Sequence, residues 1–237
     1  MATATITNPP AELTEASVAA IASDRAASTA PVAATDAKIV EQCADAALLA
    51  GREYRLSVKQ YTEMVSLGIL TEQDRVELIE GRLVTKMSKT PPHVLAVKRT
   101  FGLLYALVPA NWHVTRDDPV STLDGVPEPD ISVLRGQPDA YADRVPEPGD
   151  VGLVVEVADS SLPFDQRVKR PGYARAEIPI YWIVNIPDRR LEVHSAPTGP
   201  AGQPDYRVRT IHGPEQTVPL VLDGAEIARI AVRDLLP

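Results

Sequence analysis

The segment VGLVVEVA, residues 151–158, constrains the fold of this chain more than any other. Every residue in it is apolar or glycine except Glu156. A continuous apolar run, as opposed to an alternating one, is typical of a strand that is buried on both faces. An ionised carboxylate in such a strand is costly unless another group compensates its charge. The segment therefore predicts an interior strand and a specific partner for Glu156.

The composition is that of a folded protein with a substantial core. The 237 residues suffice for one domain with a tail or for two small domains, and 44% of them are hydrophobic. Cys43 is the single cysteine, so no disulfide can form within the chain. We find no apolar run of about 18 residues, the length that predicts a membrane helix. The first residues lack the positive start and apolar stretch of a signal peptide, and we expect a cytoplasmic protein.

Residues 1–50 differ in composition from the rest of the chain. They contain 17 alanines and no aromatic residue, which is too little apolar surface to offset the entropy lost on ordering. We predict a disordered, Ala-rich tail over residues 1–50 and a single domain over residues 51–237. The net charge is −8, and six acidic against two basic side chains place −4 of it in the tail. The charge of the domain therefore does not exclude DNA as a partner.

The pattern from residue 54 onward predicts a mixed α/β sheet with helices on its faces. Ser57 is a suitable N-cap for a first helix that ends at Gly68, and a turn at Glu80-Gly81 predicts a hairpin over residues 75–88. A long helix over 93–109 is stopped by Pro109. The other expected elements are strands over 112–123, 129–134, 152–159, 180–186 and 190–196, a helix over 165–177 kinked near Pro171, two edge strands over 206–213 and 217–224, and a short terminal helix over 230–237.

Two carboxylates lie on neighbouring strand candidates, Asp130 in PEPDISVL and Glu156 in LVVEVAD. Downstream, the spacing of Asp165, Lys169 and Tyr173 places them on one face of a helix, and we expect Tyr173 to pack in the core. A carboxylate pair at strand ends can hold Mg²⁺, which prefers oxygen ligands. A lysine beside such an ion can orient the attacking water or stabilise charge on a phosphate.

Four segments in this order resemble the Uma family of bacterial proteins, which is assigned to the PD-(D/E)XK superfamily of restriction-endonuclease-like nucleases. The segments are RVELIEGRLVTKMSKTPPH, PEPDISVL, VVEVADSS and DQRVKRPGYARAEIPIYWIV, and the resemblance spans about residues 54–196. It implies a restriction-endonuclease-like core, a central mixed β-sheet flanked by helices, with an N-terminal hairpin and additional C-terminal strands.

The resemblance also implies a set of site residues. Asp130, after Pro129, matches the Asp of the Pro-Asp element, and Glu156 matches the acidic residue of the (D/E)XK element. Glu77 matches a further acidic position. These three carboxylates are the implied ligands of Mg²⁺, for which Mn²⁺ is a possible substitute. His93 matches the histidine that opens the long helix.

The lysine of the (D/E)XK element departs from this pattern. Ala158 stands two residues after Glu156, where the lysine is expected. Lys169, on the following helix, is its implied replacement, with the role of assisting the attacking water.

The resulting hypothesis is a Mg²⁺-dependent endonuclease that hydrolyses DNA phosphodiester bonds, with a homodimer as a possible assembly. Arg167, Arg170 and Arg175 are candidates for binding the DNA backbone. The alternative is a catalytically inactive nuclease-fold protein that serves as a nucleic-acid or protein binding module, because a fold alone does not imply an activity. A third interpretation is a structural protein whose acids pair with arginines.

Each site residue also has a purely structural interpretation. Asp130 could be a turn residue at a strand start, and Glu156 could form a buried ion pair with Lys169 that carries no chemistry. Lys169 could instead be a solvated helix residue, Glu77 an exposed hairpin residue, and His93 an ordinary residue at a helix start.

Overall fold

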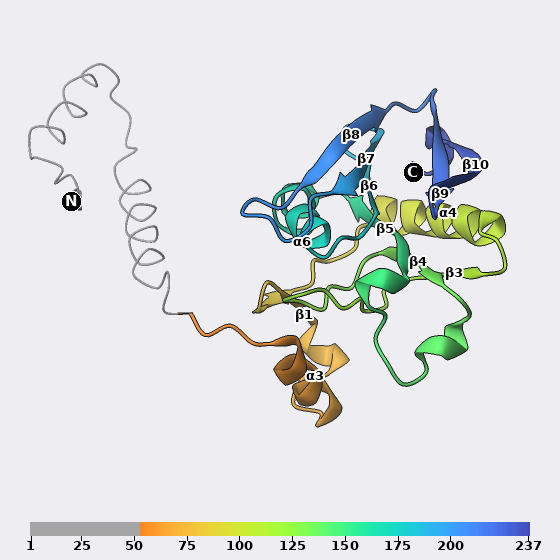
Figure 1. The fold of residues 1–237 in the computed structure, drawn as a ribbon. Helices are drawn as coiled ribbons and strands as arrows, with labels where there is room; N and C mark the ends of the chain where they lie inside the picture. Colours follow the sequence, from red (N-terminus) through yellow and green to blue (C-terminus); the bar gives the residue numbers. More distant parts are fainter. Residues whose placement is uncertain (1–52) are drawn as a thin grey trace, which may run out of the picture. The chain divides into compact units, whose positions relative to one another are not determined.

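The central feature of the computed structural model is a six-stranded sheet, drawn in Figure 1 together with the elements around it. The structure describes residues 53–237, so the predicted disorder of residues 1–50 lies outside the described part of the chain. Residues 55–237 form one compact unit. The boundary at residue 51 stays a prediction.

The strand order across this sheet is β3-β4-β5-β6-β7-β8. The strands are β3 (Trp112–Thr115), β4 (Ile131–Arg135), β5 (Val151–Ala158), β6 (Ile180–Asn185), β7 (Arg190–Pro197) and β8 (Tyr206–His212). β5 and β6 pair in parallel, whereas every other neighbouring pair is antiparallel. The sheet is therefore mixed, and the predicted fold class is confirmed.

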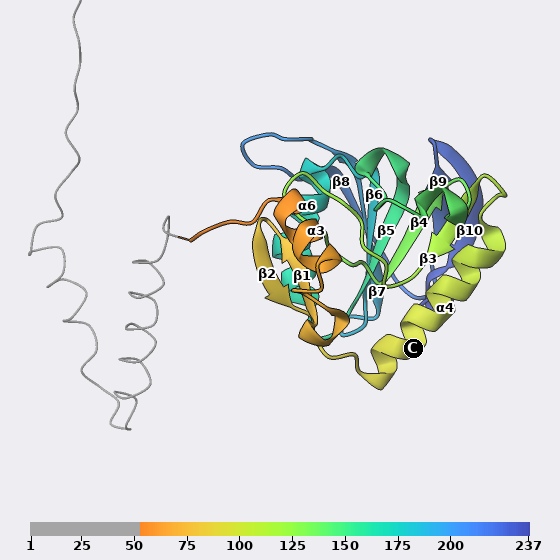
Figure 2. The ribbon, with the colours of Figure 1, turned by 90° about the horizontal axis from the view of Figure 1, so that it is seen from below.

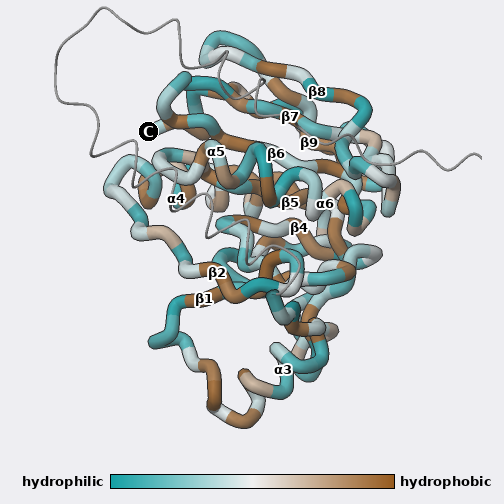
Figure 3. Tube along the Cα trace, turned by 90° about the vertical axis from the view of Figure 1, so that its left-hand side faces the viewer, coloured by the Kyte–Doolittle hydropathy of each residue, from teal (hydrophilic) through white to brown (hydrophobic). Residues whose placement is uncertain are grey.

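β5 lies inside the sheet, as its sequence predicts. All eight of its residues are buried, and Figure 3 shows apolar stretches along the central strands. One neighbour, β4, places Ile131 opposite Val155, and the other, β6, places Ile183 opposite Glu156. The carboxylate of Glu156 thus starts from the best-protected strand of the domain.

The parallel pairing of β5 and β6 requires a crossover connection, and a helical segment provides it. It consists of α5 (Leu162–Phe164), a π-helical turn (Asp165–Lys169) and α6 (Arg170–Arg175). The N–H of Arg170 donates to the carbonyl of Asp165, five residues earlier. Pro171 follows at once, and its ring would clash with a carbonyl in a regular α-turn. The kink predicted near Pro171 is therefore a widened turn.

Helix α4 (Pro91–Leu107) packs on the other face of the sheet, where it contacts β3, β4 and β5 (Figure 2). It begins two residues before the predicted start, because proline is well suited to the first position of a helix. The Thr90 side chain caps it by accepting from the N–H of His93. Val108 is extended, as expected for a residue that precedes proline.

The N-terminal elements agree with the sequence. Helix α3 (Val58–Ser66) has Ser57 and Gln60 in a capping box, and Gly68 ends it with a φ of +68°. β1 (Val76–Ile79) and β2 (Arg82–Thr85) form the predicted antiparallel hairpin. Both turn residues, Glu80 and Gly81, have positive φ, as two-residue hairpin turns require.

The C-terminal prediction was partly wrong. β8 is an edge strand, but β9 (Thr217–Leu222) forms a separate two-stranded sheet with β10 (Ala225–Ala231). The predicted helix over 230–237 is reduced to a 3₁₀ turn at Val232–Asp234. A turn at Asp223-Gly224, both with positive φ, reverses the chain and pairs AEIARIA with β9. A short apolar run does not by itself distinguish strand from helix.

Two apolar layers enclose the sheet. α4, the β9–β10 hairpin and the C-terminus cover one face, and α6 covers the other. A third, smaller cluster of Tyr61, Leu78 and Val126 joins α3 to the β1–β2 hairpin. Three 3₁₀ turns complete the described elements, at Glu72–Asp74, Pro138–Tyr141 and Pro148–Asp150. Within residues 53–237, no helix has both the length and the apolar character that crossing a membrane requires.

Gly152 shows how tightly the β9–β10 hairpin packs on the sheet. The pairing of β4 with β5 shifts register beside Gly152. A Cβ atom on this residue would lie 2.7 Å from both Leu222 Cδ2 and Trp112 Cζ3. We predict that Gly152→Ala lowers the free energy of unfolding by about 1–3 kcal/mol because the core is overpacked. Chemical denaturation measures this difference.

The matched control is Gly102→Ala in α4, where an added Cβ meets no atom within 4 Å apart from its chain neighbours and the nearby backbone of its own helix. This change should raise the free energy of unfolding by about 0.5–1 kcal/mol, since alanine favours the helix. Equal effects at the two glycines would contradict the close packing at Gly152.

Candidate active site

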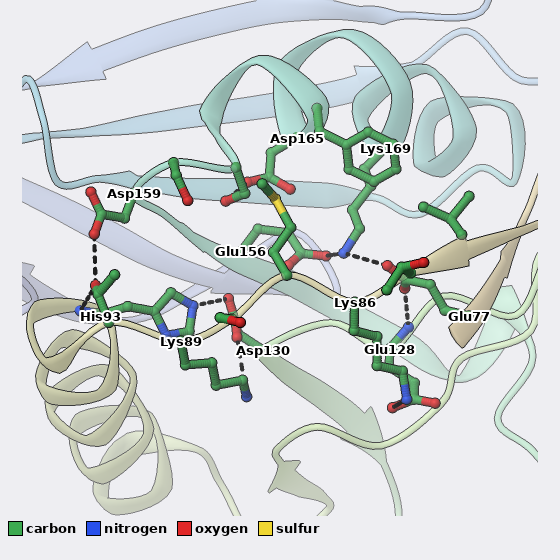
Figure 4. Close-up of a pocket in the computed structure, with 18 of the residues that line it drawn as sticks. Glu77, Lys86, Lys89, His93, Glu128, Asp130, Glu156, Asp159, Asp165 and Lys169 are labelled. Atoms are coloured by element: carbon green, nitrogen blue, oxygen red, sulfur yellow. Dashed lines mark hydrogen bonds and ion pairs between the residues drawn. The ribbon is translucent and has the colours of Figure 1, made fainter. Parts of the chain in front are cut away.

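A cavity of about 420 Å³ opens between the β1–β2 hairpin, the start of α4, the end of β5 and the crossover helix (Figure 4). Its lining includes every site residue that the sequence predicts. These residues are Glu77, His93, Asp130, Glu156 and Lys169. They come from five separate segments of the chain, so only the fold brings them together.

Glu156 has the specific partner that its place in β5 requires. Its Oε1 atom accepts from Lys169 Nζ at 2.9 Å and from the Tyr173 hydroxyl at 2.9 Å. Burial, opposed by the attraction of Lys169 and reinforced by the nearby Asp165, raises the pKa of Glu156 to about 8. Tyr173 packs in the core as predicted, and it also positions the carboxylate.

Lys169 lies between two carboxylates, which excludes its interpretation as a solvated residue. It is 8% exposed, and its ammonium is 2.9 Å from Glu156 Oε1 and 3.5 Å from Glu77 Oε1. Burial disfavours the charged ammonium, but the surrounding carboxylates, Glu156 above all, raise the pKa of Lys169. Glu77 is buried rather than exposed, and its Oε2 accepts from the N–H of Glu128 at 2.9 Å.

Asp130 stands at the entry to β4 and binds three groups. Its Oδ2 accepts from the N–H of Val157 at 2.8 Å and lies 3.1 Å from His93 Nε2, while Oδ1 lies 3.7 Å from Lys89 Nζ. Burial opposes ionisation of Asp130, but the hydrogen bond and charge of His93 and the N–H of Val157 lower its pKa. The carboxylate is therefore held ionised and oriented.

His93 occupies the first turn of α4 and also contacts the site. Its Nε2 faces Asp130, while Nδ1 is buried with no hydrogen-bond partner among the described residues. His93 is therefore both a residue of the first helical turn and a contact of Asp130, so its structural and functional interpretations are compatible.

Several further polar residues line the cavity without having been predicted for it. Asp165 is 2% exposed, accepts from the Ser161 hydroxyl at 2.7 Å, and has its pKa raised to about 6 by burial. Asp165 precedes Lys169 by four residues, about one helical turn, and this spacing could have identified it as a further site residue. Lys86, Lys89 and Asp159 belong to connecting segments, whose lack of periodicity hides the direction of their side chains from a reading of the sequence.

The arginines expected to hold DNA do not line the cavity. Arg175 pairs with Glu80 at 3.0 Å and with Asp124 at 2.6 Å. Arg170 pairs with Asp205 at 3.2 Å, and Arg167 is exposed. Two of the three are therefore engaged in ion pairs within the domain.

The deepest part of the cavity contains more negative than positive charge. Glu77, Glu156 and Asp165 surround the single ammonium of Lys169. Burial is the main reason why the pKa values of Glu156 and Asp165 are both raised, and the neighbouring carboxylates, which one positive charge cannot compensate, add to it. Protons supply the missing positive charge, and another cation could replace them.

The donor chemistry of the cavity fits a divalent cation. Carboxylate oxygens are the ligands that Mg²⁺ prefers, and Mg²⁺ commonly takes one or two of them together with water. The Lys169 ammonium lies between oxygens of Glu77 and Glu156, which shows that this part of the cavity stabilises positive charge. Among residues 53–237, no group of three or more His, Cys, Asp or Glu side chains is arranged to hold a metal ion as the chain stands.

Comparison with known proteins agrees with this architecture. Residues 58–232 match the Uma2 family, described as "Putative restriction endonuclease". The chain is also similar to a solved structure from Anabaena variabilis ATCC 29413, described as "a putative nuclease belonging to DUF820", with a TM-score of 0.57 and 13% sequence identity. The similarity covers 76% of this chain and 97% of that chain, and it shows a shared fold. No curated protein matches the sequence.

The raised pKa values predict how stability depends on pH. Unfolding returns Glu156 and Asp165 to ordinary pKa values of about 4, whereas the folded values are about 8 and about 6. The folded state thus binds more protons, so the free energy of unfolding should fall as pH rises from about 5 to 8. Asp130, with a lowered pKa, titrates below this window. Denaturation of the metal-free protein across this range measures the effect.

Glu156→Gln serves as the control because it keeps the shape of the side chain and removes its titration. The variant should lose stability less steeply than the wild type between pH 6 and pH 8, the range in which Glu156 titrates. Identical pH profiles for the two proteins would show that Glu156 is already ionised in the folded state.

Proposed function

Because the chain belongs to the Uma2 family of restriction-endonuclease-like proteins, we propose that it is a Mg²⁺-dependent endonuclease that hydrolyses phosphodiester bonds in DNA. Family and fold both point to a nuclease. One observation carries the finer proposal: the buried carboxylates of Glu77, Asp130 and Glu156 and the buried ammonium of Lys169 converge on one open cavity. Residues 51–237 would form the nuclease domain.

Asp130 and Glu156, with Glu77, would hold the divalent cation. Restriction-endonuclease-like nucleases typically use divalent metal ions, and Mg²⁺ is the ion we propose, with Mn²⁺ as a substitute. When bound, such an ion acts as a Lewis acid on the phosphate and activates water at neutral pH. The raised pKa of Glu156 supports this assignment, because burial disfavours its ionised form and a bound cation would compensate the charge that appears when the proton leaves.

The chain's own residues would orient the reacting groups. The hydroxyl of Tyr173 and the ammonium of Lys169 fix the same oxygen of Glu156, so this carboxylate has one defined direction. Lys169 would position the attacking water or neutralise charge on the scissile phosphate, and its surrounding carboxylates keep it protonated. His93 would hold Asp130 in place from the other side.

The competing function, a binding module without turnover, has one observation in its favour. Lys169 compensates Glu156 directly at 2.9 Å, so this pair can persist without a metal ion. Replacing both partners of such a pair with apolar residues is often harmless to stability. If the pair had no chemical role, replacing it with apolar residues would cost the protein little stability. The presence of the pair therefore favours the nuclease over the binding module.

Plasmid cleavage tests the proposed activity. We predict that the wild type cuts DNA with Mg²⁺ or Mn²⁺ and not with a chelator, and that Glu156→Gln reduces the rate by at least about 100-fold, because loss of groups that support a metal site commonly costs 10- to 100-fold. Glu215→Gln removes a carboxylate that is 86% exposed and should cut like the wild type. A folded Glu156→Gln protein that cuts at the wild-type rate would reject the proposed site.

Metal binding separates the nuclease from the binding module. We predict that Mg²⁺ or Mn²⁺ raises the thermal unfolding temperature of the wild type and releases protons on binding, since the carboxylates must ionise to become ligands. Asp130→Asn and Glu156→Gln should each abolish the stabilisation. Isothermal titration calorimetry in buffers of different ionisation enthalpy counts the protons. Binding of DNA by the wild type without any effect of either metal would favour the binding module.

A further inference from the structure

Two lysines of the cavity are not accounted for by the proposed chemistry. Lys86 and Lys89 lie on residues 86–90, the connection between β2 and α4. Lys86 Nζ is 2.5 Å from Glu128 Oε2, and Lys89 Nζ is 2.5 Å from Asp117 Oδ1. Their side chains are 29% and 42% exposed, against 8% for Lys169. Unlike the buried lysine, they are open to a molecule that enters from solvent.

The two lysines flank the carboxylates on opposite sides, as Figure 4 shows. Lys86 pairs with Glu128, whose N–H donates to Glu77, so it belongs to the Glu77 side of the cavity. Lys89 lies 3.7 Å from Asp130 Oδ1 and belongs to the other side. In the view of Figure 4, Glu156 and Lys169 lie above both lysines.

The connection that carries these lysines is held at both ends. The N–H of Lys86 donates to the carbonyl of Arg75 at 2.8 Å. At the other end, the Thr90 hydroxyl donates to Asp159 Oδ2 at 2.6 Å while it caps α4. The backbone positions of both lysines are thus fixed, while their long side chains can exchange partners.

The present partners of the two lysines are exchangeable. The Lys89–Asp117 pair is exposed and contributes little to stability, because water and salt screen it, whereas the Lys86–Glu128 pair is part-buried and is screened less. A backbone phosphate offers two non-bridging oxygens that share one negative charge, and it forms charge-assisted hydrogen bonds with an ammonium group just as a carboxylate does. An incoming phosphate can therefore take Lys86 from Glu128 or Lys89 from Asp117.

We infer that Lys86 and Lys89 bind backbone phosphates on the two sides of the scissile phosphate. This inference rests on the proposed nuclease function and specifies its substrate as a strand that continues in both directions from the cut. The two lysines are then positioning residues for cleavage within a strand, and they carry no sequence information.

The test is the salt dependence of DNA binding. A fluorescent DNA oligonucleotide is titrated with protein at several salt concentrations, with Ca²⁺ as the divalent ion and a gel to verify that the DNA stays intact. Each phosphate contact contributes about 0.7–0.9 to the slope of log K against log salt concentration. Lys86→Met and Lys89→Met should each weaken binding and lower the slope by about this amount, and the double variant by about twice as much.

Two controls separate a phosphate contact from damage to the fold. Lys98→Met removes an exposed lysine of α4 that does not line the cavity, and it should leave the slope unchanged. Lys86→Arg and Lys89→Arg keep the charge and should restore the slope, whereas a purely structural role would not follow charge. Thermal unfolding verifies that every variant is folded.

The outcomes are distinguishable. If the wild type binds and cuts DNA but the methionine variants keep its slope, the inference is wrong and the proposed function stands. If only one variant changes the slope, contacts on both sides are rejected. If the wild type neither binds nor cuts DNA, the proposed function fails and this inference fails with it.

Discussion

The hydrogen bond from the Lys169 ammonium to Glu156 Oε1 is the interaction on which the site depends. β5 is buried along its whole length, so a carboxylate within it needs a cation at short range. The parallel pairing of β5 with β6 forces the chain to cross over the sheet, and the crossover helix delivers that cation at 2.9 Å. The same helix adds Tyr173 to Glu156 and Asp165 to the cavity. One topological requirement thus assembles half of the site.

The electrostatics of the cavity follow from this arrangement. The crossover supplies one ammonium but also a further carboxylate, and the β1–β2 hairpin adds Glu77. Burial, reinforced by the neighbouring carboxylates, raises the pKa of Glu156 to about 8, which is unusual for a glutamate. Such a site is well suited to a divalent cation, since the cation can replace the protons that burial and the neighbouring carboxylates retain.

The sequence predicted what depends on local pattern or on the family resemblance. The apolar run around Glu156 identified β5, and the family segments identified Asp130 and Lys169, which indeed line one cavity. β10 was missed because AEIARIA becomes a strand only when the Asp223-Gly224 turn folds it onto β9. The lysines of residues 86–90 were missed because a connection without periodicity gives no sign of where its side chains point.

The central claim, that Glu156 holds a proton which a divalent cation displaces, can be tested by NMR of the protein labelled with ¹³C at the glutamate carboxyl. Without metal, Glu156 should titrate near pH 8. With saturating Mg²⁺, its resonance should be that of an ionised carboxylate throughout the neutral range. Glu156→Gln identifies the resonance by its absence. Titration of Glu156 near its ordinary pKa of about 4.3, unaffected by Mg²⁺, would contradict the account.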